Sequence, residues 1–367
     1  MNQPLCFANP KAQFETHRGA IEAAIRQVLE TGTYIQGPAH EVFEREFAKY
    51  IGVSHAIGVA NGTDALVIAM RALGIASGDR VLVPSHTASP TVSAVRQVGA
   101  IPVFLDVEEG SYVITPSAVE VSLASDIKAV IAVHLYGRPV DVISMRALVD
   151  RAGVLLIEDC AQAAGAQIGN RLVGSIGHAG CFSFFPTKNL GAIGDGGMIT
   201  VNDSDTASRV RRLRNFGWSA DRTCTEDGFN SRLDELQAAV LAAKLPTLDV
   251  SNRRRRDIAI RYRNGLQDLE IGLPHDIAEG YHVYHLFVIA VDDRENLLES
   301  LKKEGVVAGI HYPVPNHLHP AFAPFSDCPL RSTERVARRV VSLPIYPELS
   351  TADVERVVSV IRAHYGR

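Results

Sequence analysis

The stretches KAVIAVHLYG at 128–137 and GVLLIEDC at 153–160 decide the fold of this chain of 367 residues. Both runs are apolar over most of their length instead of alternating, as expected for strands that helices cover on both faces. From about Val53 onward, short β-branched runs such as VLVPS and IPVFLDV alternate with amphipathic stretches such as TDALVIAMRALG. This alternation predicts an α/β fold of repeated βα units, with a mostly parallel sheet and the two apolar runs in its middle.

The pattern changes after Leu236, where a helical stretch rich in Ala and Arg is followed by the Pro-rich connections HYPVPNHLHP and SLPIYP. Because 367 residues exceed the usual size of one hydrophobic core, we predict a large domain over 1–243, N-terminal segment included, and a smaller C-terminal α/β domain over 244–367. We interpret the run SNRRRR at 251–256 as the solvated face of a helix, since four adjacent helical residues cannot all face one partner.

Composition excludes several classes of function. The net charge of -4 gives no broad field that would attract nucleic acid or an anionic membrane. No apolar run approaches the roughly 20 residues that cross a bilayer, and Met1–Lys11 lacks the layout of a signal peptide. We therefore expect a cytoplasmic protein. The five cysteines are scattered, with Cys160 and Cys181 inside apolar runs, so we expect neither a disulfide nor a cysteine-based metal site.

The first motif with chemical content is ANGTDAL at 60–66, between a predicted strand and a predicted helix. Gly62 permits close backbone approach, Thr63 offers a hydroxyl, and the first N–H groups of a helix have no partner within it. Together these features predict a cradle for an anion such as phosphate. A helix N-cap by Asn61 or Thr63 also explains the motif.

The second motif is LIEDCAQ at 156–162, where a buried strand ends in two adjacent carboxylates. Successive strand residues face opposite sides, so only one carboxylate can point into a site at the carboxyl edge of the sheet. We select Asp159, since a carboxylate there would keep a pyridinium nitrogen protonated. Helix N-capping by Asp159 is the alternative.

The third motif is CFSFFPTKN at 181–189, followed by LGAIGDGG at 190–197. The aromatic strand delivers Lys188 into surroundings that should lower the pKa of its amine by desolvation and keep it nucleophilic. A surface lysine after a strand is the common alternative. The glycines that follow argue against that alternative, because they cost entropy unless a ligand or another backbone approaches closely.

In this order and at these separations, the three motifs resemble the DegT/DnrJ/EryC1/StrS family of sugar aminotransferases, which depend on pyridoxal 5'-phosphate (PLP). The resemblance covers almost the whole chain. It implies the aspartate-aminotransferase-like fold, known as fold type I, and a homodimer whose active sites lie at the subunit interface. Further stretches carry it: Gly37-Pro38, Phe43-Glu44, HLYG at 134–137, NSRLDELQAA at 230–239, HYP at 311–313 and LPIYP at 343–347.

The resemblance also implies roles for single residues. Lys188 matches the lysine that forms a Schiff base with PLP and then moves the proton, and Asp159 matches the partner of the pyridine nitrogen. Gln162 matches a contact to the ring hydroxyl. The other matches are phosphate contacts at Gly62, Thr63 and Ser183, a contact to the partner subunit's cofactor phosphate at Asn230, and positions near the sugar nucleotide at Arg232, His311 and Tyr312.

One histidine departs from the family pattern, and a group of three others offers an alternative as a metal site. His86 stands where many family members place an aromatic ring that stacks on the cofactor, and an imidazole presents less area and can titrate. His311, His317 and His319 offer metal-ligand chemistry, but a Pro-rich loop gives no regular ligand spacing, so we predict no metal.

The resemblance implies that glutamate converts PLP to pyridoxamine phosphate, which then aminates a nucleotide-linked keto-sugar. The stretch 188–197 is similar to the lysine loop of C-3 aminating members, with Asp195 where many C-4 members have Glu. We therefore expect a dTDP-linked 3-keto-6-deoxyhexose as substrate, with C-4 amination or a cyclitol or aminohydroxybenzoate-type activity as alternatives. Lys188 argues against a 3-dehydratase of similar fold, which has histidine there. The retained Lys188, Asp159, Gln162 and Ser183 argue against a non-catalytic sensor.

Overall fold

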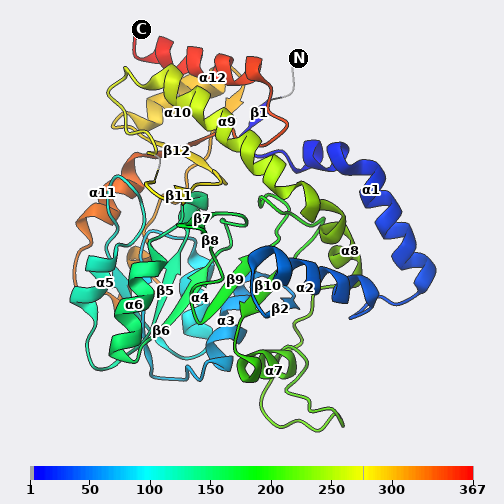
Figure 1. Cartoon of the computed structure of the whole chain (residues 1–367). Helices are drawn as coiled ribbons and strands as arrows, with labels where there is room; N and C mark the ends of the chain where they lie inside the picture. The colour runs from blue at the N-terminus through cyan, green and yellow to red at the C-terminus, as the bar shows by residue number, and fades with distance from the viewer. Residues whose placement is uncertain (1–3, 276, 367) are drawn as a thin grey trace.

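The structure is a computed structural model that describes residues 4–275 and 277–366. Its centre is a seven-stranded sheet in the order β2-β10-β9-β6-β5-β3-β4 (Figure 1). Strands β5 and β6 are the two apolar runs, and they lie in the middle of the sheet as predicted. The strands of this sheet are β2 (His55–Val59), β3 (Arg80–Pro84), β4 (Ile101–Leu105), β5 (Ile127–Val133), β6 (Leu155–Asp159), β9 (Ala179–Ser183) and β10 (Gly197–Val201).

The sheet is parallel from β9 to β4, and only β10 runs antiparallel to its two neighbours. Strands β6 and β9 pair with Asp159 opposite Cys181, so their carboxyl ends meet at one edge. This edge holds both Asp159 and, just beyond Ser183, the segment of Lys188. The predicted α/β fold with a mostly parallel sheet is thereby confirmed.

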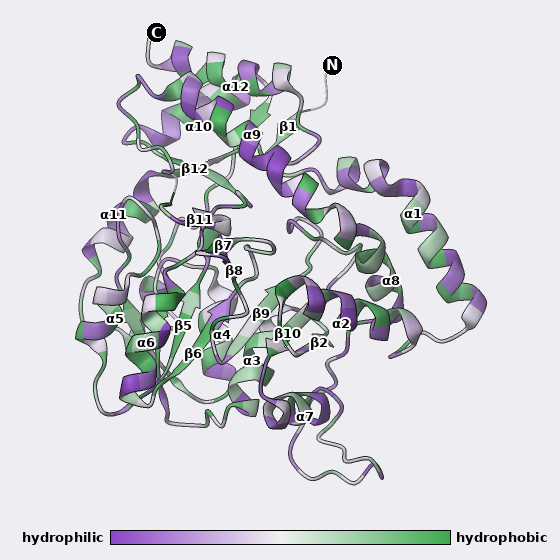
Figure 2. Ribbon diagram, viewed as in Figure 1, coloured by the Kyte–Doolittle hydropathy of each residue, from purple (hydrophilic) through white to green (hydrophobic). Residues whose placement is uncertain are grey.

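Helices cover the sheet and continue into the C-terminal part (Figure 1). Strands of the sheet are coloured mostly as hydrophobic in Figure 2, whereas many surrounding helices carry one hydrophilic side. The helices are α1 (Pro10–Thr31), α2 (Pro38–Ile51), α3 (Gly62–Ala72), α4 (Ser89–Gln97), α5 (Pro116–Ser122), α6 (Val142–Ala152), α7 (Ser204–Leu213), α8 (Glu235–Lys244), α9 (Leu248–Leu266), α10 (Arg294–Lys303), α11 (Arg331–Arg339) and α12 (Thr351–His364).

The C-terminal part has its own apolar cluster, to which Ile258, Phe287, Leu343 and Ile361 belong. Leu5 packs into the same cluster, because β1 pairs with β13 and so joins the start of the chain to this part. The division into domains at residues 243 and 244 stays a prediction. The short strands outside the main sheet are β1 (Leu5–Cys6), β7 (Gln167–Ile168), β8 (Arg171–Leu172), β11 (Gly280–Tyr281), β12 (Phe287–Ala290), β13 (Val306–Val307) and β14 (Val340–Leu343).

The arginine run on α9 is only partly solvated, so our interpretation of it is wrong in one respect. Arg255 is 3% exposed, and its guanidinium donates to the carbonyls of Ile345, Tyr284 and His285. Three carbonyl acceptors around Nη1 take the place of water at that end of the buried guanidinium, whereas its Nε has no hydrogen-bond partner. The run therefore fixes α9 against the C-terminal part as well as presenting charge to solvent.

A buried carboxylate joins Gly37-Pro38 to the distant stretch 230–239. Glu235 accepts hydrogen bonds from the backbone N–H groups of Gly37, Ala39 and His40 at 2.9, 2.6 and 3.1 Å. These groups lie at the start of α2, where an anion stabilises the helix. A Cβ on Gly37 would lie 2.8 Å from the carboxylate, so this close approach requires glycine.

Candidate active site

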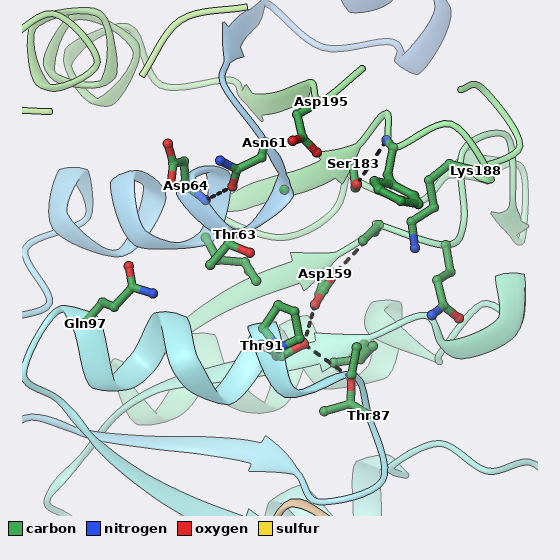
Figure 3. A pocket seen from close by; sticks show the side chains of 18 residues that line it. Asn61, Thr63, Asp64, Thr87, Thr91, Gln97, Asp159, Ser183, Lys188 and Asp195 are labelled. Carbon is green, nitrogen blue, oxygen red and sulfur yellow. Dashed lines mark hydrogen bonds between the residues drawn. The ribbon is translucent and has the colours of Figure 1, made fainter. Parts of the chain in front are cut away.

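The carboxyl ends of β6 and β9 open into a cavity of about 460 Å³ beside the start of α3 (Figure 3). Six of the residues that we predicted for the site line it, together with side chains from α4 and the loop before it. The six are Gly62, Thr63, Asp159, Gln162, Ser183 and Lys188. The sequence therefore identified the residues that three separate segments bring to one place.

The predicted anion cradle is the first turn of α3. Asn61 caps this helix, since its side chain accepts the N–H of Asp64 at 2.8 Å, so the capping alternative is correct for Asn61, and anion binding stays a prediction. Gly62 and Thr63 follow the cap, and their N–H groups have no acceptor within the helix. A Cβ on Gly62 would lie 2.7 Å from Cβ of Ser183, so glycine lets the cradle close against the end of β9.

The two carboxylates at the end of β6 face different surroundings. Asp159 lines the cavity, accepts from Thr91 Oγ1 at 2.8 Å and from the N–H of Ala161 at 3.1 Å, and is 4% exposed. Burial raises the pKa of Asp159, so the cavity leaves its negative charge incompletely compensated. The alternative of a helix N-cap is wrong, because the next element in the described chain is the strand β7.

Glu158 points into the protein and not into the cavity. It accepts from the N–H groups of Gly174, Ile176 and Gly177 and from His134 Nε2 at 3.1 Å. His134 and the backbone donors stabilise the ionised form and lower the pKa of Glu158, although burial opposes them. Its oxygens are fully used, and it organises the loop before β9.

Lys188 follows β9 and points into the cavity (Figure 3). Its side chain is half-buried, because it is reached through the cavity and otherwise surrounded by protein. Desolvation lowers the pKa of Lys188 to about 8, and the charge of Asp159 opposes that shift. About a tenth of the amine is therefore unprotonated at pH 7, against well under a hundredth for an ordinary lysine, and the unprotonated form is the nucleophile.

Gln162 is held in place on both sides of its amide. Its Oε1 accepts the N–H of Tyr136 at 2.6 Å, and its Nε2 donates to Oη of Tyr312 at 2.9 Å. One Nε2 hydrogen is left for a ligand in the cavity. Tyr312 therefore stands at the edge of the site, although it does not belong to the lining residues.

His86 is 1% exposed and does not line the cavity, whereas Thr87 and Ala88 do. Its Nε2 lies 2.7 Å from Oη of Tyr136, whose hydroxyl donates to the carbonyl of His311. Burial lowers the pKa of His86 to about 3, so the capacity of the imidazole to titrate is not used near neutral pH. Its predicted stacking on the cofactor stays a prediction.

Asn230, Arg232 and His311 also lie outside the lining of the cavity. Asn230 is exposed and forms an isolated antiparallel β-bridge with Asn215. The guanidinium of Arg232 lies over the ring of Phe216, 5.8 Å from its centroid. Between them, Ser231 is fully buried and donates to Asp64 at 2.6 Å. The segment that carries Asn230 is thereby fixed to the first turn of α3.

The described residues contain one group with metal-ligand geometry, formed by His134, Glu158 and Cys160, whose candidate ligand atoms lie within 4.8 Å of one another. His134 Nδ1 accepts the N–H of Val140, and Glu158 is saturated by the donors named above. These hydrogen bonds account for the group as a structural element. His311, His317 and His319, weighed above only as an alternative metal site, do not form such a group among the described residues.

The arrangement of the sheet and the site defines the class: this is the fold of the fold type I PLP-dependent aminotransferases. The chain belongs to the DegT/DnrJ/EryC1/StrS aminotransferase family, which it matches over residues 15–362. It is 42% identical over 98% of both chains to the UDP-N-acetyl-3-dehydro-alpha-D-glucosamine 3-aminotransferase of Acidithiobacillus ferrooxidans.

Two further similarities involve Streptomyces venezuelae. The chain is 43% identical to its dTDP-3-amino-3,4,6-trideoxy-alpha-D-glucose transaminase, over 97% of this chain and 95% of the relative. It superposes on the crystal structure of DesV from S. venezuelae in complex with a ketimine intermediate with a TM-score of 0.97, at 42% identity and over 100% of both chains. The chain is thus a PLP-dependent nucleotide-sugar aminotransferase. Within the described residues, no helix has the length and apolar character to span a membrane.

Proposed function

We propose that this enzyme transfers the amino group of L-glutamate to C-3 of a 3-keto-6-deoxyhexose linked to dTDP, and that it does so in the cytoplasm. Two observations agree and carry the proposal. The lysine loop at 188–197 is similar to that of C-3 aminating family members, and the relatives from A. ferrooxidans and S. venezuelae point to the same carbon. Both are named for sugars with chemistry at C-3, one on UDP and one on dTDP.

The cavity fits PLP on chemical grounds. A phosphate would bind the N–H groups of Gly62 and Thr63 and the hydroxyl of Ser183, where the start of α3 favours an anion. The incompletely compensated carboxylate of Asp159 would hold a proton on the ring nitrogen, which would supply the missing positive charge. Bound PLP supplies an electron sink for breaking bonds at the carbon that bears the nitrogen.

Lys188 is the residue that attaches the cofactor and then moves protons in this proposal. Its pKa of about 8 allows the amine both to accept and to donate a proton near neutral pH. Gln162 has a free Nε2 hydrogen for the ring hydroxyl. Tyr312 stays available at the edge of the cavity for the sugar nucleotide, with His311 preceding it in the chain.

We further propose that two copies of the chain share their sites. Large apolar side chains of the N-terminal part are exposed: Leu29, Tyr34, Ile35 and Val42. An apolar groove of about 310 Å³ between α1, α2 and α8 adjoins Val42. Exposed apolar surface of this kind marks an interface, and Asn230 and Arg232 stand outside their own cavity, free to serve a partner's cofactor and substrate.

Mixing two inactive variants tests the sharing of sites. Lys188→Ala lacks the amine, and the double variant Asn230→Ala plus Arg232→Ala lacks the residues offered to a partner. A mixed dimer contains one site with neither defect, so activity should return to about a quarter of the wild-type value after subunit exchange. No recovery after exchange, demonstrated by native mass spectrometry, would contradict shared sites.

The substrate proposal is tested with a panel of dTDP- and UDP-linked 3-keto and 4-keto sugars and L-glutamate, read by mass spectrometry. NMR of the product then locates the amino-bearing carbon. We expect turnover of a dTDP-linked 3-keto-6-deoxyhexose. Nitrogen at C-4 from a 4-keto sugar, with no turnover of 3-keto sugars, would overturn the regiochemistry, and exclusive use of UDP sugars would overturn the nucleotide.

A further inference from the structure

Asn189, the residue that follows Lys188, has a side chain for which the proposed chemistry has no use. It is 5% exposed and does not line the cavity. Its Nδ2 donates to Oδ1 of Asn252 at 2.8 Å and to the carbonyl of Val283 at 3.1 Å. Nδ1 of His285 lies 3.2 Å from its Oδ1. Both amide hydrogens and the amide oxygen are thus engaged, which fixes the orientation of the side chain.

Asn252 extends this network to the other strand end of the site. It lies on α9, is completely buried, and donates from Nδ2 to the carbonyl of Ala164 at 3.0 Å. The adjacent Gly165 packs so tightly that a Cβ there would lie 2.5 Å from the same nitrogen. The pair formed by Asn189 and Asn252 therefore joins the loop of Lys188 to the segment that carries Asp159 and Gln162.

The loop of Lys188 has other supports, but they act through its backbone. The N–H of Lys188 donates to the carbonyl of Phe185, and the N–H of Ala192 donates to that of Phe184. Lys244 donates to the carbonyl of Gly191. Asn189, by contrast, follows Lys188 directly and contacts the surrounding elements through its own side chain. It therefore fixes the backbone next to Lys188.

The charged and titratable groups around Lys188 leave its pKa sensitive to enclosure. Asp159 is the group that raises this pKa, and desolvation lowers it more strongly. His285 and His311 also interact electrostatically with the amine, and burial keeps both imidazoles neutral by lowering their pKa, for His311 to about 4. The position of the loop therefore decides how strongly the surrounding protein atoms desolvate the amine.

We propose that Asn189 is a positioning residue for Lys188, and that through Asn252 it holds the amine in the enclosed position where it is nucleophilic. The proposal rests on the proposed function only in taking Lys188 as the reactive lysine. Its physical content concerns the amine of this one side chain, which is measurable in the full chain before PLP is added.

Competitive acetylation with acetic anhydride over pH 6–11, followed by peptide mapping, gives the titration midpoint of Lys188. The reagent is small enough to enter the cavity that Lys188 lines. For the wild type we expect a midpoint near 8. In Asn189→Ala and in Asn252→Ala we expect a midpoint about one pH unit higher, and hence about tenfold less labelling at pH 7, because a loosened loop leaves the amine less desolvated.

Two controls separate positioning from general stabilisation. Thr200→Val removes a hydroxyl that is 1% exposed and donates to the carbonyls of Gly174 and Gly180, so it should lower stability without moving the midpoint. The double variant of Asn189 and Asn252 should shift the midpoint no further than either single variant, because the two act as one unit.

The proposal is overturned if Asn189→Ala and Asn252→Ala unfold at lower urea concentrations, as Thr200→Val does, while both keep the wild-type midpoint. If Asn189→Ala does not fold, Asn252→Ala decides the question alone. A failure of the proposed function would look different: borohydride reduction of the PLP-loaded protein would label another lysine, while the midpoint of Lys188 would still move in the two variants.

Discussion

Two adjacent buried carboxylates and two enclosed lysines lie in contrasting settings. Asp159 and Lys188 line the cavity, and each keeps hydrogen-bonding capacity for a ligand. Glu158 and Lys244 lie in the packed interior: Glu158 accepts three backbone N–H groups, and Lys244 donates to Gln13 Oε1 at 2.7 Å and to the carbonyl of Gly191. Desolvation lowers the pKa of both lysines to about 8.

The comparison teaches that a perturbed pKa does not by itself distinguish a catalytic group from a structural one. Perturbed groups concentrate at functional sites, but structural networks perturb pKa values too. The difference lies in whether other groups within the protein already engage the hydrogen-bond donors and acceptors of the titratable side chain. The variants below test that difference, beginning with the largest expected effect.

Lys188→Ala should lower the rate of the half-reaction with L-glutamate by at least about 10³-fold, since both the attachment point and the proton carrier are lost. Lys244→Met should keep at least about a tenth of the rate per folded molecule. Absorbance changes of the bound cofactor give both rates. Borohydride reduction and peptide mapping of the wild type should place the pyridoxyl label on Lys188, and a label on Lys244 would reverse the comparison.

The carboxylates are compared by two isosteric variants. Asp159→Asn should lower turnover by about 10²-fold or more with little loss of stability, because a neutral amide cannot hold a pyridinium proton. Glu158→Gln should instead lower the free energy of unfolding by about 2–4 kcal/mol, because an amide nitrogen then faces backbone donors. Circular dichroism during urea unfolding, beside the half-reaction, measures both. Equal losses of turnover in the two variants would break the distinction.

The sequence predicted the residues that line the cavity better than the contacts of the buried residues in the packed interior. Asp159 and Lys188 were predictable because the carboxyl ends of neighbouring parallel strands meet at one edge, so local patterns suffice to bring them together. The backbone partners of Glu158 lie 16 to 19 residues along the chain in a loop without a recognisable pattern. Glu235 meets the start of α2 across almost 200 residues, a contact that only the folded chain reveals.

Other differences have the same cause. Arg255 appeared as part of a solvated run, yet the packing of α9 brings three backbone carbonyls to it. His86 is a residue type that can titrate near neutral pH, but its burial beside the rings of Tyr136 and Tyr312, which come from distant segments, is not visible in the sequence. Strand β1 lies with the C-terminal part because it pairs with β13, about 300 residues later in the chain. Such long-range contacts carry no local sequence pattern.

The smallest expected effect concerns the stability cost of enclosing Lys244. Its pKa of about 8 in the folded protein lies below the ordinary value of 10.5, so between these values the unfolded chain binds more protons than the folded one. The free energy of unfolding linked to this residue therefore rises with pH through that window, and the full cost of enclosing the charged amine applies below pH 8.

Lys244→Met removes the titrating group, and Glu348, the nearby charge that raises the pKa, is unchanged in it. The difference in unfolding free energy, wild type minus variant, should increase by about 1–3 kcal/mol from pH 7.5 to pH 10. Urea unfolding of both proteins at several pH values measures it, and because the tyrosines that also titrate there are common to both, their contribution cancels. A difference that stays constant with pH would mean that the two hydrogen bonds of Lys244 keep its amine charged in the interior, and that enclosure alone does not lower the pKa of a fully partnered lysine.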